Sequence, residues 1–322
     1  MPPSRRPSNT DDPAQPPADH TDDITTAPPD SETATGTPTE LPVPVDETRT
    51  YIQIRPAREP LDCDTVESHL RRLHQLGEAT NTDDTGLSGL FSRESERPTI
   101  ECLLVTDAGA DADLTYLVGT DSPETLDTLE RTLRGLFPDR YELERTDRPA
   151  DHLTTHLQPE TNTLGTVTYQ GTPQRRADWQ TTLTPFRDFA EDTDTDSRVP
   201  LATIVETMAD SAAPMVYQAL VEPKPDWTSV ADQRRQAIEA AQDTFSDQLT
   251  TAFFGPPDED VALPASDQTR LDELAERETR RSFVVTARLA VATADTATAR
   301  HLTDNLASTF AAVSNTCYEI EG

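Results

Sequence analysis

Residues 48–150 show two kinds of hydrophobic spacing in a fixed order, and this order limits the folds that this part of the chain can adopt. Four short apolar runs have the length and composition of strands: YIQIR, ECLLVT, LTYLVGT and RYELER. Two longer stretches, which begin near Asp64 and Pro123, carry apolar residues three or four positions apart, as on the buried face of a helix. The predicted order of elements is therefore β-α-β-β-α-β.

This order is typical of the ferredoxin-like split βαβ fold, in which two helices lie on one face of an antiparallel sheet. The turn AGADAD favours a hairpin between the second and third strands. Asp121 or Ser122 is placed to cap the second helix, with Pro123 in its first turn and Pro138 after its end. We predict a first ferredoxin-like α/β unit at residues 48–150.

Residues 214–322 repeat much of this pattern at a larger scale. The run MVYQALVEP predicts a strand that Pro223 ends, and a long helix, the strand SFVVTARLAVAT, a helix capped by Asp295 and a last strand follow it. The segments YIQIRPAREP and YQALVEPKPD hold the same place in the two halves, which favours an internal duplication. Independent use of a common strand-helix pattern is the alternative.

The predicted fold class is thus α+β, with two ferredoxin-like units (β-α-β-β-α-β type) that have antiparallel sheets, the second at residues 214–322. The connecting segment, residues 151–213, is expected to contain a short strand and a helix. Residues 1–47 are rich in Pro, Thr, Asp and Ser. Because so few apolar side chains cannot offset the entropy lost on ordering, we predict a disordered acidic tail there.

The charge of the chain excludes some functions. Its 322 residues include 59 Asp and Glu against 27 Lys and Arg, a formal charge of −32. Such self-repulsion opposes the compact state unless salt screens it, and at molar salt the Debye length falls to about 3 Å. We therefore predict a halophilic organism with a salt-rich cytoplasm, and no extensive direct nucleic-acid binding. The arginines that occur in pairs are expected to be solvated partners of acidic residues: Arg71-Arg72, Arg175-Arg176, Arg234-Arg235 and Arg280-Arg281.

The lack of targeting signals and the spacing of the cysteines predict a soluble cytoplasmic protein. No run approaches the roughly 18 apolar residues that a membrane span needs, and the N-terminus lacks the apolar core of a signal peptide. Cys63, Cys102 and Cys317 lie far apart, so neither a zinc ribbon nor a disulfide framework is indicated. A position at the periphery of a membrane-associated complex stays open, as does a homo-oligomer.

Lys224 is the only lysine of the chain, and it follows the predicted strand in the sequence Glu-Pro-Lys-Pro-Asp. A P-loop needs a lysine after a glycine-rich turn, because the lysine must reach the terminal phosphates. Lys224 has no such glycine, and no G-x-S-x-G nucleophile elbow occurs. We therefore predict no catalytic residues, no cofactor and no enzymatic activity. Lys224 itself is either a turn residue or a contact to a partner.

Histidine spacing offers one alternative. His152 and His156, beside Asp151, are four positions apart, which on a helix would place two imidazoles on one face, as in a metal site. No third ligand lies close in sequence, so a polar linker helix is the prediction and a metal site is the alternative. That alternative would make the chain a small metal-dependent hydrolase. His69 and His74 are expected at the surface.

Several extended segments occur in a characteristic order between about residues 48 and 322. They are TRTYIQIRP, RRLHQL, ECLLVTD, YLVGTDSPETLDTLERTLRGLFPDRYELER, DWQTTLTPF, VPLATIVETMADSAAPMVYQALVEPKPDW, AIEAAQDTFSDQLTTAFFG, TRLDELAERETRRSFVVTARLAV and TCYEIEG. In this order they resemble the N-terminal region of large haloarchaeal conjugation-type ATPases, relatives of the VirB4, TraC and HerA motors. In that family the region precedes a P-loop motor, whose nucleotide-binding motifs have no counterpart here.

The resemblance implies a non-catalytic accessory or docking module of a conjugation or type IV secretion-like DNA-translocating ATPase system. It is compatible with a stand-alone module, a split system, or a truncated N-terminal part of the ATPase. The expected partner is a protein, either a HerA- or VirB4-like ATPase or the platform on which it assembles. No catalytic residue is carried over from the family.

Overall fold

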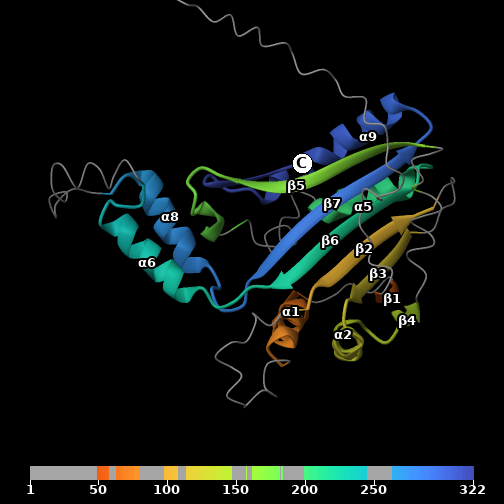
Figure 1. Cartoon of the computed structure of the whole chain (residues 1–322), viewed down its shortest axis with the longest axis horizontal. Coiled ribbons are helices and arrows are strands. Elements are labelled where there is room, and N and C mark those ends of the chain that lie inside the picture. The colour runs from red at the N-terminus through yellow and green to blue at the C-terminus, as the bar shows by residue number, and fades with distance from the viewer. Residues whose placement is uncertain are drawn as a thin grey trace, which may run out of the picture. The chain divides into compact units, whose positions relative to one another are not determined.

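The computed structural model describes residues 49–57, 63–79, 98–107, 114–146, 157, 162–181, 183, 199–244 and 263–322. Within them the fold is α+β, and their strands form one eight-stranded antiparallel sheet in the order β4-β1-β3-β2-β6-β7-β5-β8 (Figure 1). The tail predicted at residues 1–47 lies outside the described residues. None of the described helices combines the length and apolar character of a membrane span.

One half of the sheet, with strands β4, β1, β3 and β2, comes from the first half of the chain. Its elements are β1 (Thr50–Arg55), α1 (Cys63–Ala79), β2 (Ile100–Thr106), β3 (Leu114–Thr120), α2 (Pro123–Leu136) and β4 (Glu142–Thr146). The predicted order β-α-β-β-α-β is confirmed here. Ser122 caps α2 by accepting a hydrogen bond of 3.3 Å from the amide of Thr125, and Pro123 is the first helical residue, where its missing N–H costs nothing.

The other half of the sheet comes from the second half of the chain, which has more elements than the sequence predicts. They are β5 (Thr163–Pro173), the 3-10 helix η2 (Asp178–Gln180), α5 (Pro200–Asp210), β6 (Met215–Pro223), α6 (Thr228–Glu239), α8 (Ala265–Glu276), β7 (Phe283–Thr293), α9 (Thr296–Ala307), the 3-10 helix η3 (Thr309–Val313) and β8 (Tyr318–Glu321). The predicted cap of α9 is confirmed, because Asp295 accepts from the amide of Thr298 at 2.9 Å.

The two halves of the sheet meet where β2 pairs with β6, from Ile100 opposite Val221 to Thr106 opposite Met215. A buried polar cluster reinforces this seam. The Glu101 carboxylate is completely buried, and it accepts hydrogen bonds of 2.7 Å each from the Tyr51 hydroxyl and from the Arg49 guanidinium. Gln218 on β6 donates a further hydrogen bond to Glu101, so the cluster joins β1, β2 and β6. The buried charge is therefore paired.

Strand β5 changes its partner along its length, and this change shapes the rest of the molecule. From Thr163 to Tyr169 it pairs with β7, and from Gln170 to Pro173 it pairs with β8 instead. In Figure 1, β5 accordingly curves away from the beginning of β7. The sequence predicts a short strand in this region but neither its length nor its two partners.

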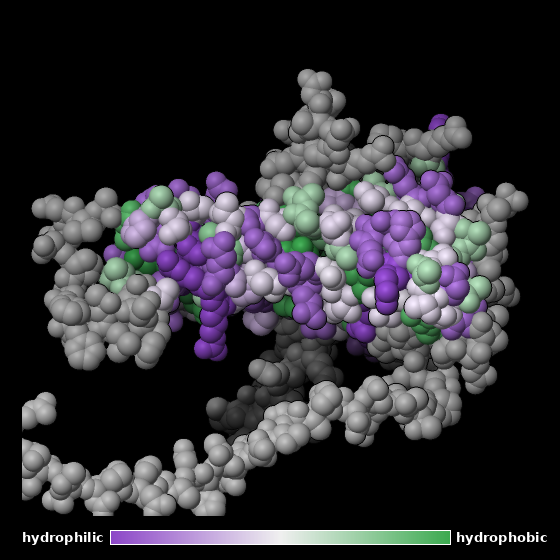
Figure 2. Space-filling model, turned by 90° about the horizontal axis from the view of Figure 1, so that it is seen from above, coloured by the Kyte–Doolittle hydropathy of each residue, from purple (hydrophilic) through white to green (hydrophobic). Residues whose placement is uncertain are grey.

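Apolar side chains fill both faces of the sheet because successive residues of a strand point to opposite sides. On β6, Met215 and Tyr217 pack with Ile204 of α5 and Leu306 of α9, whereas Val216 packs on the opposite face with Leu103. A further cluster joins α1 and α2 to β1. The surface is mixed, with hydrophilic groups interspersed among small hydrophobic areas on the face that Figure 2 shows.

Candidate ligand-binding pocket

A cavity of about 520 Å³ lies where β5 leaves β7. Its walls come from the end of β5, the beginning of β7, η3 and β8, together with Trp179 and Trp227. Gly171 of β5 leaves room for Tyr318 of β8, because a Cβ at position 171 would overlap the ring and hydroxyl of Tyr318. Glycine at this position therefore lets β8 pair with the end of β5 while the Tyr318 ring forms part of the cavity wall.

Aromatic side chains dominate the wall of this pocket. The whole chain has 9 Phe, 6 Tyr and 2 Trp, and 2 Phe, 3 Tyr and both Trp line the cavity. The rings contact each other as well: Trp179 and Trp227 have centroids 5.2 Å apart, and Tyr169 meets Phe310 edge to face at 4.6 Å. In a chain with 5% aromatic residues, such a concentration marks the pocket as a place for contact with a ligand.

Lys224 lies at this pocket and is held by its backbone. Its amide donates to the Ser282 carbonyl at 2.8 Å, and its own carbonyl lies 3.0 Å from His74 Nε2. The ammonium group sits on the face of Trp179, with Nζ 3.3 Å from the ring centroid, and lies 5.6 Å from the centroid of Trp227. Such cation-π contacts hold a desolvated lysine in one orientation. Burial, and to a smaller extent the charge of Arg277, lowers the pKa of Lys224 below its ordinary value.

Arg277 is the second cation of the pocket, and it follows the end of α8. Its Nε is buried without a hydrogen-bond acceptor, and burial lowers the pKa of the guanidinium. Among the described residues no carboxylate lies within ion-pair distance of Arg277 or Lys224, and no Asp or Glu lines the cavity. Both charged residues in the wall are therefore positive, in a chain whose net charge is −32.

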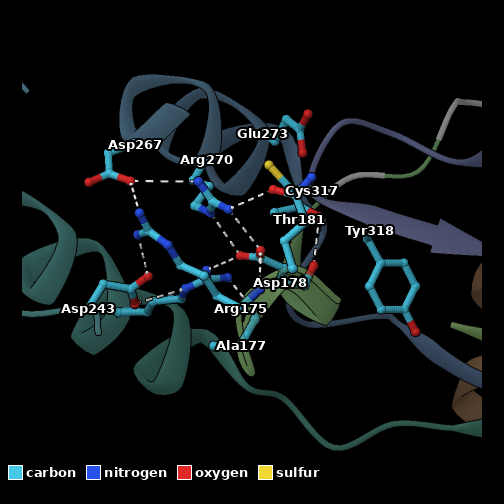
Figure 3. A network of polar contacts seen from close by, with 12 residues as sticks. Arg175, Ala177, Asp178, Thr181, Asp243, Asp267, Arg270, Glu273, Cys317 and Tyr318 are labelled. Atoms are coloured by element: carbon cyan, nitrogen blue, oxygen red, sulfur yellow. Dashed lines mark hydrogen bonds and ion pairs between the residues drawn. The ribbon is translucent and has the colours of Figure 1, made fainter. Parts of the chain in front are cut away.

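A buried ion network surrounds Asp178 (Figure 3), the residue that precedes Trp179 of the pocket wall. Asp178 of η2 is completely buried and accepts hydrogen bonds of 3.0 and 3.1 Å from Arg270 of α8. Arg234 of α6 binds the same carboxylate, and the amide of Arg175 donates to it at 2.8 Å. Burial by itself would raise the pKa of Asp178, but the hydrogen bonds from Arg270 and Arg234 outweigh it and hold the pKa below its ordinary value.

The network continues to two further aspartates and so balances its charges. Arg175 pairs with Asp243 at 3.0 Å and with Asp267 at 2.6 Å. The prediction that the paired arginines are solvated is wrong for Arg234, whose side chain is 5% exposed. Its counter-charge, Asp178, lies 56 residues away in the sequence, so local charge patterning gave no indication of the burial.

The predicted surface positions of His69 and His74 are also wrong. His74 is 1% exposed, and its ring meets Phe283 edge to face with centroids 5.4 Å apart. His69 is 5% exposed, and its Nδ1 lies 2.8 Å from the Thr65 carbonyl. The two histidines are buried against different elements, because His69 lies against α2 near Gly135 and His74 lies against Phe283 of β7. In this position His74 contacts the backbone carbonyl of Lys224.

The metal candidates His152, His156 and Asp151 lie outside the described residues. Within the described ranges, no three His, Cys, Asp or Glu side chains come together closely enough to hold a metal ion. Of the residues singled out from the sequence, the pocket contains Lys224. The tryptophans were missed, and their rarity in the chain is the signal that could have drawn attention to them.

Comparisons of the chain with known protein families, with curated proteins and with solved structures find no match. The pocket is therefore interpreted from its own chemistry.

Proposed function

We propose that this chain is a non-catalytic docking module that binds a partner protein at the pocket beside Lys224. The observation that carries the proposal is the composition of the wall, in which aromatic and aliphatic side chains surround two cations, Lys224 and Arg277. Rigid aromatic rings and an arginine are the groups that contribute most to protein-protein binding. Acid-base or nucleophilic chemistry would instead call for a carboxylate, imidazole or activated nucleophile beside the ligand.

The proposal extends to the architecture, which we interpret as two ferredoxin-like units. The first is β1-α1-β2-β3-α2-β4, and the second is β5-α5-β6-β7-α9-β8 with α6 and α8 inserted between its two middle strands. Read from the outer edges, the strand orders β4-β1-β3-β2 and β8-β5-β7-β6 are the same. In this interpretation β5 is the counterpart of β1, and the second unit begins near Thr163, earlier than residue 214. Three residues that flank the inserted helices, Lys224, Trp227 and Arg277, line the pocket.

The resemblance of the sequence to conjugation-type ATPases suggests the setting. In this proposal the module serves a DNA-translocating ATPase system of a halophilic archaeon, in the cytoplasm or at the periphery of a membrane-associated complex. The partner is a HerA- or VirB4-like ATPase or its platform. The acidic surface is compatible with a protein partner and disfavours a broad nucleic-acid interface.

The test is an affinity capture at molar potassium chloride with three tagged forms of the full chain. Lys224→Glu reverses a charge in the pocket, and Arg300→Glu makes the same change at an exposed position on α9. We expect the wild type and Arg300→Glu to recover an ATPase or platform component that Lys224→Glu loses. Equal recovery by all three forms would refute docking at the pocket. Recovery of a partner unrelated to translocation would refute the proposed setting.

A further inference from the structure

The beginning of β7 is a strand edge that no described strand covers. Along one side, β7 pairs with β6 from Phe283 to Val291. Along the other side, its pairing with β5 extends only between Ala287 and Thr293, because β5 then turns to β8. From Phe283 to Thr286, every second residue thus directs its backbone N–H and C=O away from β6 without a strand partner among the described residues. This segment forms a wall of the aromatic pocket.

Three of the four side chains on this free edge, Phe283, Val284 and Val285, are apolar, which is unusual for an uncovered strand. Val284 is 47% exposed and Val285 is 58% exposed. Natural proteins usually protect free edges with charged residues, prolines or bulges, because an apolar edge pairs with other chains. Among the described residues the other exposed large apolar side chains, Leu70, Leu201 and Val230, lie on separate helices. The two valines form an apolar stretch next to the pocket, as expected for a surface that is covered when a ligand binds.

Besides the free backbone edge and the apolar side chains, the two cations of the pocket restrict the chemistry of the ligand. Lys224 and Arg277 are partly desolvated, and neither has a carboxylate partner within the described part of the chain. The buried arginines Arg234 and Arg270, in contrast, are paired with Asp178. A partly desolvated guanidinium without a counter-charge is costly, and an incoming carboxylate would reduce that cost. The pocket therefore favours an acidic ligand despite the negative charge of the chain as a whole.

We propose that the β7 edge from Phe283 to Thr286 binds an extended segment of the partner protein as an added strand. An apolar side chain of that segment enters the aromatic pocket, and an acidic side chain binds Lys224 and Arg277. An added strand gains main-chain hydrogen bonds from the edge and side-chain specificity from the pocket. A small aromatic carboxylate would satisfy the rings and the cations but would leave the backbone edge unpaired. The inference rests on the proposed docking function and names its binding mode.

The test uses two defined peptides and the full chain at molar potassium chloride. Each peptide is acetylated and amidated, so that one glutamate is its sole charge: Ac-Thr-Glu-Thr-Phe-Thr-NH2 and Ac-Thr-Phe-Thr-Glu-Thr-NH2. Alternate residues of a strand share a face, so Glu and Phe both point into the pocket in one or the other order. Both tryptophans of the chain line the pocket, and their fluorescence therefore reports binding.

We expect one of the two peptides to bind saturably. Replacing its Glu by Gln should weaken binding about tenfold or more, because a charge-assisted bond to a desolvated cation is lost. Methylation of the backbone amides on one alternate set of residues should abolish binding, whereas methylation of the other set should not. A carbodiimide should couple the bound glutamate to Lys224, the only lysine, through an amide bond that mass spectrometry locates.

Arg277→Gln is the matched protein variant, and Arg235→Gln on the exposed side of α6 is its control. Arg277→Gln should reduce the preference for Glu over Gln in the peptide, and Arg235→Gln should leave it unchanged. The inference is overturned if neither peptide binds up to millimolar concentration, if both sets of methylated peptides bind like the parent, or if 3-phenylpropionate binds as tightly as the peptide. Loss of the captured partner on Lys224→Glu, together with any of these outcomes, would leave docking intact and remove strand addition alone.

Discussion

Replacing Asp178 by Asn removes the central negative charge of the buried ion network, and its expected cost follows from the contacts. The carboxylate accepts two bonds from Arg270, one from Arg234 and one from a backbone amide. Breaking a buried ion pair costs about 3–5 kcal/mol, because a charge is left without compensation. Here Arg234 keeps Asp243 at 3.3 Å, and Arg270 keeps the Ser266 carbonyl at 3.0 Å. We therefore expect a loss at the lower end, about 3 kcal/mol in the free energy of unfolding.

The measurement is urea unfolding at molar potassium chloride, followed by far-UV circular dichroism and by tryptophan fluorescence. The control is Asp232→Asn, which removes the acid of an exposed pair with Arg235 on α6. That change should cost less than about 0.5 kcal/mol. If Asp178→Asn and Asp232→Asn cost the same, the network does not stabilise the fold and the reasoning is wrong.

The pH dependence of the same variant gives a second check. The folded-state pKa of Asp178 is held below its ordinary value of 3.8. A carboxylate with a lowered pKa contributes stability above its unfolded pKa and loses it as the pH falls through the folded value. The stability difference between the wild type and Asp178→Asn should therefore be constant near neutral pH and should shrink below about pH 4. A difference that grows on acidification would contradict the assignment.

Two further predictions concern the pocket. Reductive methylation with a carbon-13 label gives Lys224 a single side-chain NMR signal, whose titration should give a pKa below the ordinary 10.5. Trp179→Leu should alter this pKa, because the ammonium lies on the Trp179 ring. A pKa at or above 10.5 would contradict burial of the ammonium. Gly171→Ala should displace Tyr318 and cost about 1–3 kcal/mol, as overpacking does, whereas Gly135→Ala on α2 should cost less. An unchanged unfolding midpoint for Gly171→Ala would refute the close contact.

The parts of the fold that could be predicted are those whose signals are local. Ser122 and Pro123 specify the start of α2, and Asp295 that of α9, because a cap involves residues within one turn of the helix. The alternation of YIQIR and the leucine spacing of α2 likewise depend on neighbours in the sequence. These signals were sufficient for the element order of the first half and for the α+β class.

The pocket could not be predicted because its parts are brought together by pairings between distant residues. The change of partner at Tyr169 depends on β7 and β8, which lie more than a hundred residues further along the chain. The burial of His74 depends on Phe283, and that of Arg234 on Asp178. Hydrophobic period and charge spacing describe one segment at a time, so they contain no information on such contacts. Lys224 was noticed because it is unique, which is a property of composition.

The seam between β2 and β6 has a consequence for how the molecule comes apart. Its register runs without interruption between Ile100–Val221 and Thr106–Met215, and the Glu101 cluster spans it. A half released by proteolysis would expose a long central strand edge, and the first half would lose the hydrogen bond from Gln218 to Glu101, so neither half is expected to survive alone. Denaturation should then be a single cooperative event. A ligand bound at β7 should therefore raise the melting temperature reported by a probe in β1 or β3 as much as that reported by a probe in β5.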